Sequence, residues 1–278
     1  MSNIAQLYSI ATNVNRYGSL IVFLFGSVGV VLNVFIFSTD RELKQNPCSR
    51  IFLASSIASC ISLFSGLPTR FFNSFGLDFT AKYDIPCKFY MITLVGALSC
   101  SALFIALASI ECWLNSSLKV SYRTILSMKN VNRAITITVT MAFLCYSHIL
   151  YCYAANQKNA RGACTGINSV CLYLSDFIHL ILFIIIPIGI MLIFGSLTLR
   201  NIKQNHRRIA NVKTNQNKSN VRGSQRQQST LTALMLIQVC LITMCNLSAG
   251  IYKIYSTVTD YIYIRVQNDE PSKLSSFN

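Results

Sequence analysis

The chain has 278 residues, of which 53% are hydrophobic and 12% charged, and its formal net charge is +15. A soluble domain normally carries about twice that charged fraction, so the composition excludes an ordinary soluble protein and indicates several membrane spans. The positive charge would suggest nucleic-acid binding in a soluble protein, but here it lies in the connections between apolar segments, and we expect no nucleic-acid partner.

Six apolar segments are long enough to cross a bilayer, which requires about 20 residues of helix. We therefore predict an all-α membrane protein, with a helix bundle over residues 18–255 between an N-terminal segment (1–17) and a polar tail (256–278). After the sixth segment, Tyr255–Ile264 is too short for a seventh span. The six predicted spans are residues 18–38, 51–72, 89–110, 134–155, 177–199 and 229–252.

The third segment is predicted to be the central helix of the bundle. It has 22 uncharged residues between Lys88 and Glu111, so the helix from Cys87 to Glu111 is about 36 Å long, slightly more than a hydrocarbon core. Small residues at four-residue spacing, such as Gly96 and Cys100, let neighbouring helices approach closely. We therefore expect a helix packed on several sides, with a cysteine at one membrane face and a carboxylate at the other.

The distribution of Lys and Arg predicts the orientation. The connections after the first, third and fifth segments carry 15 of these residues, and the N-terminal segment and the other connections carry five. Positive residues accumulate on the cytoplasmic side, so the N-terminus is expected outside the cell and the chain in the plasma membrane. The most basic connection, residues 200–228, is then a cytoplasmic loop that either contacts anionic lipid or docks a partner.

A few polar residues in or near the spans are candidates for ligand binding. Asp176 and His179 are three residues apart on one helical face near the outer end of the fifth span, and Arg70 lies near the outer end of the second. They either contact a ligand or are interfacial residues hydrated at the headgroups. His148 is expected in the middle of the fourth span, where a histidine more often bonds a neighbouring helix than performs chemistry.

The sequence suggests neither catalysis nor transport. The eleven cysteines include no C-x-x-C pair and no Cys/His cluster, so we expect no metal site and no cofactor. The spans hold no acid near their middle and show no internal repeat, which argues against an enzyme and against a six-span channel or transporter.

The chain contains, in this order, Asn33, Pro68, Cys87, the triplet Glu111-Cys112-Trp113 and Pro187. This ordered set of residues resembles the rhodopsin-like (class A) G-protein-coupled receptors, especially the neuropeptide (FMRFamide-type) receptors. The resemblance covers about residues 18–255. It implies a receptor that binds an extracellular ligand, with a peptide the expected class, and that signals by helix rearrangement to a heterotrimeric G protein at loops 114–133 and 200–228.

The resemblance also implies one disulfide. In such receptors the cysteine that opens the third helix, here Cys87, pairs with a cysteine of the second extracellular loop, where an oxidising environment favours the bond. Cys164 is the preferred partner and Cys171 the alternative, because Cys171 is already close to the fifth span.

The chain departs from the family at positions used for activation. Cys112 replaces the arginine of the triplet, and a thiol cannot make that residue's bidentate charged contact. In the sixth span, Cys245 and Ser248 begin and end a motif that lacks the family's Trp and Pro.

The family's sodium-binding carboxylate and its seventh helix have no counterpart either. Ser59 stands at the carboxylate position, beside the expected core polar residues Asn33 and Ser101. The sequence therefore leaves two alternatives: a signalling receptor, or a truncated, signalling-silent relative, such as a binding or decoy protein or an incomplete gene product.

Overall fold

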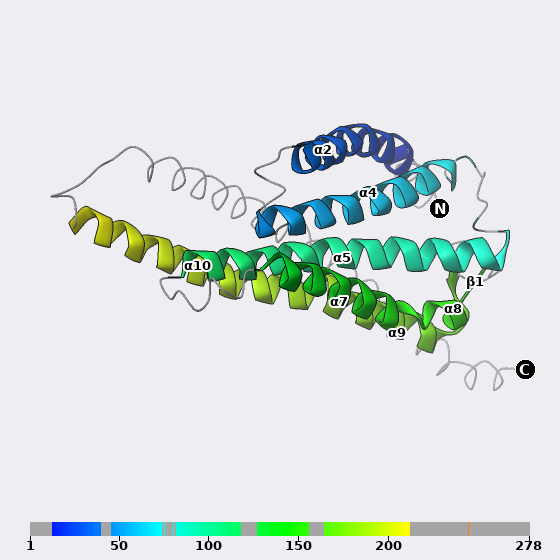
Figure 1. The fold of residues 1–278 in the computed structure, drawn as a ribbon. Helices are drawn as coiled ribbons and strands as arrows, with labels where there is room; N and C mark the ends of the chain where they lie inside the picture. Colours follow the sequence, from blue (N-terminus) through cyan, green and yellow to red (C-terminus); the bar gives the residue numbers. More distant parts are fainter. Residues whose placement is uncertain are drawn as a thin grey trace, which may run out of the picture.

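The structure is a computed structural model of the chain and describes residues 13–39, 46–73, 75, 80, 82–117, 127–155, 164–211 and 244. These residues form helices and one two-stranded sheet (Figure 1). In chain order the elements are η1 (Val14–Gly18), α2 (Ser19–Thr39), α4 (Pro47–Asn73), α5 (Asp84–Ser116), α7 (Met128–Tyr146), α8 (Ile149–Cys152), β1 (Tyr153–Ala155), β2 (Cys164–Gly166), α9 (Ser169–His179), η2 (Leu180–Ile185) and α10 (Ile186–Asn211).

Five helices of the described part are long and apolar enough to cross a membrane. This agrees with the predicted all-α membrane protein. Apart from Met244, the predicted sixth span (229–252) lies outside the described residues, as does the tail (256–278). The five helices are Arg16–Thr39, Pro47–Asn73, Asp84–Ser116, Met128–Cys152 and Ser169–Asn201.

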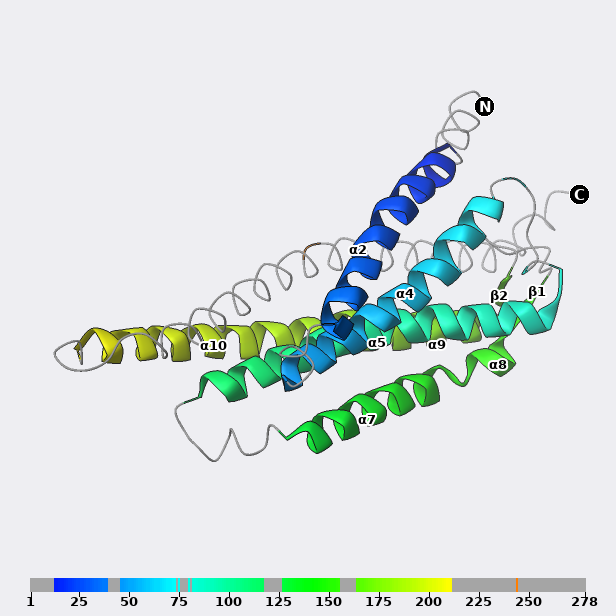
Figure 2. The ribbon, with the colours of Figure 1, turned by 45° about the horizontal axis from the view of Figure 1, so that its top comes forward.

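Helix α5 is the centre of the described bundle, as predicted. It packs against α4, α7 and α10 (Figures 1 and 2). In the most apolar stretch of 18 residues in α5, half of the residues are buried inside the bundle. In the most apolar stretch of 18 residues in Arg16–Thr39, none is buried. The predicted small residues make this packing possible, because a Cβ added to Gly96 would lie 3.1 Å from the Phe143 ring of α7.

Helices α4 and α5 are also joined by hydroxyl groups. The Ser59 and Ser101 hydroxyls are hydrogen-bonded at 2.6 Å, and the Ser55 hydroxyl donates to the Ser101 carbonyl oxygen at 3.2 Å. Ser101 thus lies between the helices, as expected of a core polar residue. Asn33 does not join this network: α2 packs along α4, and Asn33 is on its exposed side.

Two spans differ from their predicted bounds. The fourth was predicted to be helical over 134–155, but its helix is interrupted at Ser147 and His148 and is followed by strand β1. The fifth was predicted over 177–199, but helix begins at Ser169 and continues to Asn211. Apolarity predicts only the part of a helix that lies in lipid, so polar turns at either end are missed.

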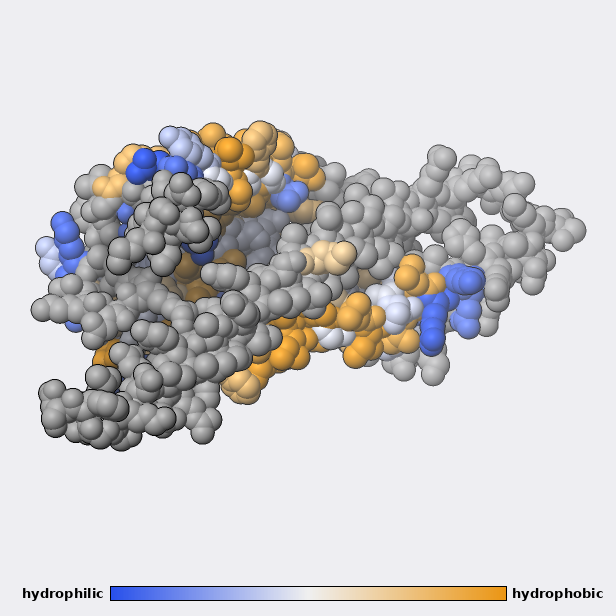
Figure 3. Space-filling model, turned by 180° about the vertical axis from the view of Figure 1, so that it is seen from behind, coloured by the Kyte–Doolittle hydropathy of each residue, from blue (hydrophilic) through white to orange (hydrophobic). Residues whose placement is uncertain are grey.

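The outer surface of the described helices is apolar. Figure 3 shows hydrophobic residues over much of the coloured surface, with hydrophilic residues gathered toward its ends. Large exposed side chains include Phe25 and Phe35 on α2 and Leu192 on α10. Such a surface is suited to contact with lipid chains rather than water.

Replacement of Ser101 by Ala is expected to weaken the contact between α4 and α5. It removes the hydroxyl that bonds Ser59, and interhelical hydrogen bonds in membranes contribute about 0.6 kcal/mol on average and at most about 1.7. Thermal unfolding of the detergent-purified protein measures the change. Ser65→Ala is the matched control, because the Ser65 hydroxyl bonds carbonyl groups of its own helix; an equal loss in both variants would contradict the interhelical role.

Candidate functional site

A short β-hairpin is tied to the first turn of α5. Strands β1 and β2 are antiparallel, with Ala155 opposite Cys164. Asp84 in the first turn of α5 accepts a hydrogen bond from the Ala155 backbone N–H at 2.7 Å, and Cys164 is joined to the fully buried Cys87 by a disulfide with a Cα–Cα distance of 5.5 Å. Each strand therefore has its own link to α5. We call this end of the bundle the hairpin end and the opposite end the Glu111 end.

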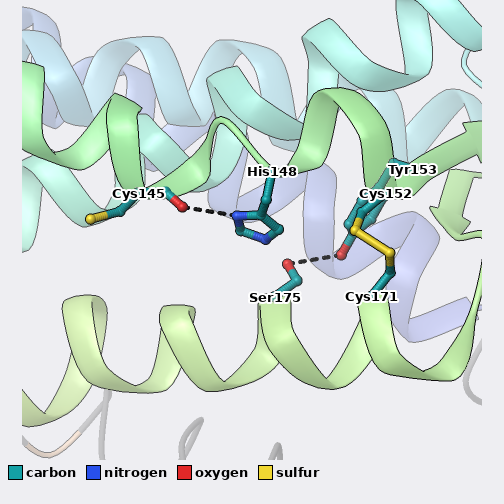
Figure 4. The surroundings of a disulfide bond; sticks show 6 residues. All are labelled: Cys145, His148, Cys152, Tyr153, Cys171 and Ser175. Carbon is teal, nitrogen blue, oxygen red and sulfur yellow. Dashed lines mark hydrogen bonds between the residues drawn. A yellow bond between two sulfur atoms is a disulfide. The ribbon is translucent and has the colours of Figure 1, made fainter.

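The hairpin end contains a second disulfide. The pairing of Cys87 with Cys164 is the one preferred from the family resemblance, and the alternative partner Cys171 is instead bonded to Cys152, with a Cα–Cα distance of 5.3 Å (Figure 4). Sequence reasoning missed this bond because Cys152 fell inside a predicted span, where cysteine usually serves as a small apolar residue. The bond joins the end of α8 to α9.

Tyr153 and Ser175 connect the hairpin to α9. Tyr153 is buried, and its hydroxyl donates to the Ser175 hydroxyl oxygen at 3.0 Å (Figure 4). Burial raises the pKa of Tyr153, so the phenol remains a neutral donor at physiological pH.

Tyr146 connects the three helices α5, α7 and α9. It is fully buried on α7, and its hydroxyl is hydrogen-bonded to Ser99 of α5 at 2.6 Å and to Nδ1 of His179 on α9 at 3.3 Å. The His179 ring also stacks on Phe183, with 4.9 Å between ring centroids. The candidate ligand residue His179 is therefore half-buried and linked to the core.

The other two candidate ligand residues lie on different helices. Asp176 is half-buried on α9, one turn before His179 as the sequence predicted. Arg70 is exposed in the last turn of α4 and takes no part in the Tyr146–His179 contacts. The structure thus keeps the α9 pair on one helix and leaves Arg70 on a separate exposed position.

A wide helical turn separates this region from the rest of the fifth span. Residues Leu180–Ile185 form the π-helix η2, and Pro187 follows in the first turn of α10. Proline has no N–H to donate within a helix and commonly distorts the turn before it. Short π-helical turns are uncommon and often accompany functional sites, and this one begins directly after His179.

His148 lies near the hairpin end rather than in the middle of a span. It is in the break between α7 and α8, and its Nδ1–H donates to the Cys145 carbonyl oxygen at 2.8 Å. The expected bond to a neighbouring helix is thus replaced by one to its own helix. Nε2 is buried without a hydrogen-bond partner in the described part of the chain, and Figure 4 shows the ring on the side facing Ser175.

At the Glu111 end, the three residues of the triplet contact different surroundings. Glu111 is 5% exposed, and its two carboxylate oxygens have no hydrogen-bond partner among the described residues. The Cys112 sulfur lies 3.9 Å from that of Cys48, and the Trp113 and Phe194 ring centroids are 5.3 Å apart. Consecutive residues of a helix project about 100° apart, so the triplet faces three directions.

The remaining predicted site regions are described only in part. Cys245 and Ser248 lie outside the described residues. The predicted loop 114–133 begins within α5, which ends at Ser116, and ends within α7, which begins at Met128. The predicted loop 200–228 begins within α10, which ends at Asn211.

The chain matches no protein-family model, and a search of curated proteins finds no match either.

Removal of either disulfide by paired Cys→Ser replacement is expected to destabilise the protein by different amounts. The Cys87–Cys164 bond closes a loop with a sequence separation of 77 residues and the Cys152–Cys171 bond a loop with a separation of 19. From the loop-closure entropy of the unfolded chain, loss of the first bond lowers the free energy of unfolding by about 4.5 kcal/mol and loss of the second by about 3 kcal/mol. Thermal unfolding of the oxidised proteins, compared with the same proteins after reduction, measures both. Equal stability of the wild type and both double variants before reduction would contradict this assignment.

Tyr146→Phe is expected to lower the free energy of unfolding by about 1–3 kcal/mol, because it leaves the buried hydroxyl of Ser99 and the His179 ring without their shared partner. Tyr151→Phe is the matched control: Tyr151 is nearby in α8 but 85% exposed. Chemical denaturation of both variants in detergent checks the difference, and similar values would refute the three-helix role of Tyr146.

Proposed function

We propose that the chain is a receptor of the rhodopsin-like class, which binds an extracellular ligand at the hairpin end and transmits binding to the Glu111 end by helix rearrangement. The observation that carries the proposal is the disulfide between Cys87, in the first turn of the most buried helix, and Cys164 in the hairpin before α9. The family resemblance implied that bond, and it joins the central helix to the hairpin at the end of the bundle where the candidate ligand residues Arg70, Asp176 and His179 lie.

The proposed ligand is a peptide or another small molecule with polar ends. Arg70, exposed near the hairpin end of α4, is suited to a carboxylate or amide group of such a ligand. Asp176 and His179 supply an acidic and an imidazole group on α9. In this proposal the hairpin end faces the outside of the plasma membrane, which the Lys and Arg distribution supports.

Transmission along the bundle would depend on α5 and on the fifth span. Helix α5 packs against α4, α7 and α10, so a displacement of its hairpin end would change its contacts with each of these helices. His179 of the proposed ligand site is hydrogen-bonded to Tyr146 of α7 and lies directly before η2. The wide turn of η2 and Pro187 at the start of α10 allow the fifth span to change its bend. A G protein would contact loops 114–133 and 200–228, the second of which begins with the basic end of α10.

A second candidate function is a receptor relative that binds its ligand without signalling. The observation that favours it is the buried Glu111, whose carboxylate has no hydrogen-bond partner among the described residues. In the resembling receptors the arginine beside this acid pairs with it at rest and meets the G protein when active; here the position is Cys112. A thiol cannot replace either contact.

Nucleotide exchange on heterotrimeric G proteins in membranes containing the chain tests both functions. With a panel of amidated and free peptides, the signalling receptor predicts exchange above background for the natural sequence. The silent relative predicts exchange near background for the natural sequence and a roughly tenfold increase for Cys112→Arg, the size of a typical coupling of about 1.4 kcal/mol. Cys112→Ser is the control, since it removes the thiol without adding charge.

The outcomes separate the two functions. Saturable peptide binding without exchange supports the silent relative, and robust exchange by the natural sequence contradicts it. If no peptide binds saturably and Cys112→Arg remains at background, the receptor proposal is wrong.

A further inference from the structure

Two cysteines of neighbouring helices, neither of them in a disulfide bond, meet at the Glu111 end. Cys48 is the second residue of α4 and Cys112 lies near the end of α5, and their sulfur atoms are 3.9 Å apart. Both side chains are partly buried. The two helices run in opposite directions, so the start of one lies beside the end of the other (Figure 2).

The packing of α4 on α5 holds these two cysteines in place. Both contact a cluster of buried residues that includes Ile51 and Phe52 of α4 and Ala108 of α5. The Cys48 backbone N–H donates to the Asn46 side-chain oxygen at 3.1 Å, which fixes the first turn of α4. Further along the helices, the hydrogen bond between Ser59 and Ser101 opposes sliding of one helix past the other. The short sulfur–sulfur distance is therefore a consequence of helix packing.

We propose that Cys48 and Cys112 are an oxidation site, at which a hydroperoxide converts the two thiols into a disulfide that joins α4 to α5. The sulfur atoms have to approach from 3.9 Å to about 2.05 Å, a movement within reach of side-chain rotation. The proposal does not depend on the receptor function, because it rests on the contact between two helices alone.

The reaction balances with one peroxide for each disulfide. One sulfur, as its thiolate, attacks a peroxide oxygen; an S–O bond forms, the O–O bond breaks, and the sulfenic acid and one water result after protonation. The second sulfur then attacks the sulfenic sulfur; the S–S bond forms, the S–O bond breaks, and a second water leaves. Two electrons pass from the thiols to hydrogen peroxide, which is reduced to two waters.

Oxidation would change the mechanics of the central helix. At the hairpin end α5 is already joined covalently to β2 by the Cys87–Cys164 bond. The new bond would join its other end to α4, immediately beside the buried Glu111 and the Trp113 ring. This end is predicted to face the reducing cytoplasm, where the thiol form is the resting state. Peroxide would thus restrict movement of α5 relative to α4.

Peptide mapping of the full chain in membranes tests the proposal. After treatment with hydrogen peroxide and blocking of the remaining thiols with N-ethylmaleimide, digestion with trypsin and Glu-C places Cys48 in peptide 45–50 and Cys112 in peptide 112–119, separate from Cys100. We expect these two peptides to be linked, and the link to disappear after reduction. If the peroxide-treated chain contains sulfinic acids or other disulfides but not this link, the proposal is overturned.

Single variants provide the matched comparison. In Cys112→Ser, the thiol that would attack the sulfenic acid of Cys48 is missing, so we expect peroxide to leave Cys48 as a thiol or as a sulfenic or sulfinic acid and not in a disulfide with residue 112, and Cys48→Ser should do the same for Cys112. Cys60→Ser, a free and partly buried cysteine of the same helix, should leave the link unchanged. Loss of the link in Cys60→Ser would contradict the assignment.

A measurement on the natural sequence keeps the test decisive if the variants do not fold. Phenylarsine oxide binds two adjacent thiols together, and we expect it to protect both Cys48 and Cys112 from maleimide until a dithiol removes it. Maleimide labelling of either cysteine at an undiminished rate would show that the two thiols do not act as a pair.

Discussion

The close approach of α4, α7 and α10 to α5 is the constraint on which the rest of the described structure depends. Lipid offers helices no hydrophobic reason to associate, so contact has to come from packing and interhelical hydrogen bonds. Small residues supply the packing, because a Cβ at Gly66 would lie 2.8 Å from Leu94 and one at Gly96 only 3.1 Å from Phe143. Ser59 and Ser101 supply a hydrogen bond at the same interface.

The hairpin end adds covalent and polar contacts to this packing. Two disulfides join the hairpin and α8 to α5 and α9, and Asp84 and Tyr153 bond the same elements through side chains. These contacts stabilise an irregular segment that apolar packing alone would not hold. They also hold the part of α9 that carries Asp176 and His179 against the core. In the proposed receptor, these two residues would contact the ligand.

The Glu111 end has the opposite character. The buried carboxylate of Glu111 has no hydrogen-bond partner in the described part of the chain. At the same end, the Cys48 and Cys112 sulfur atoms lie 3.9 Å apart. An unpaired buried acid is costly, and such groups are commonly retained for a function. A charged or oxidised partner at residue 112 would alter this end first, so both proposals lead to the same few residues.

The sequence by itself determined the helical membrane class, the central place of α5 and the one-turn spacing of Asp176 and His179, because span length, small-residue spacing and helical periodicity are local properties. It also supported the Cys87–Cys164 pair, although only through resemblance. The tertiary structure alone decided that Cys152 bonds Cys171, that residues 153–155 form a strand and that Cys48 meets Cys112. These features join residues far apart in the chain, or override local helix preference through pairing with another segment, and no pattern along one segment records which other segment lies beside it.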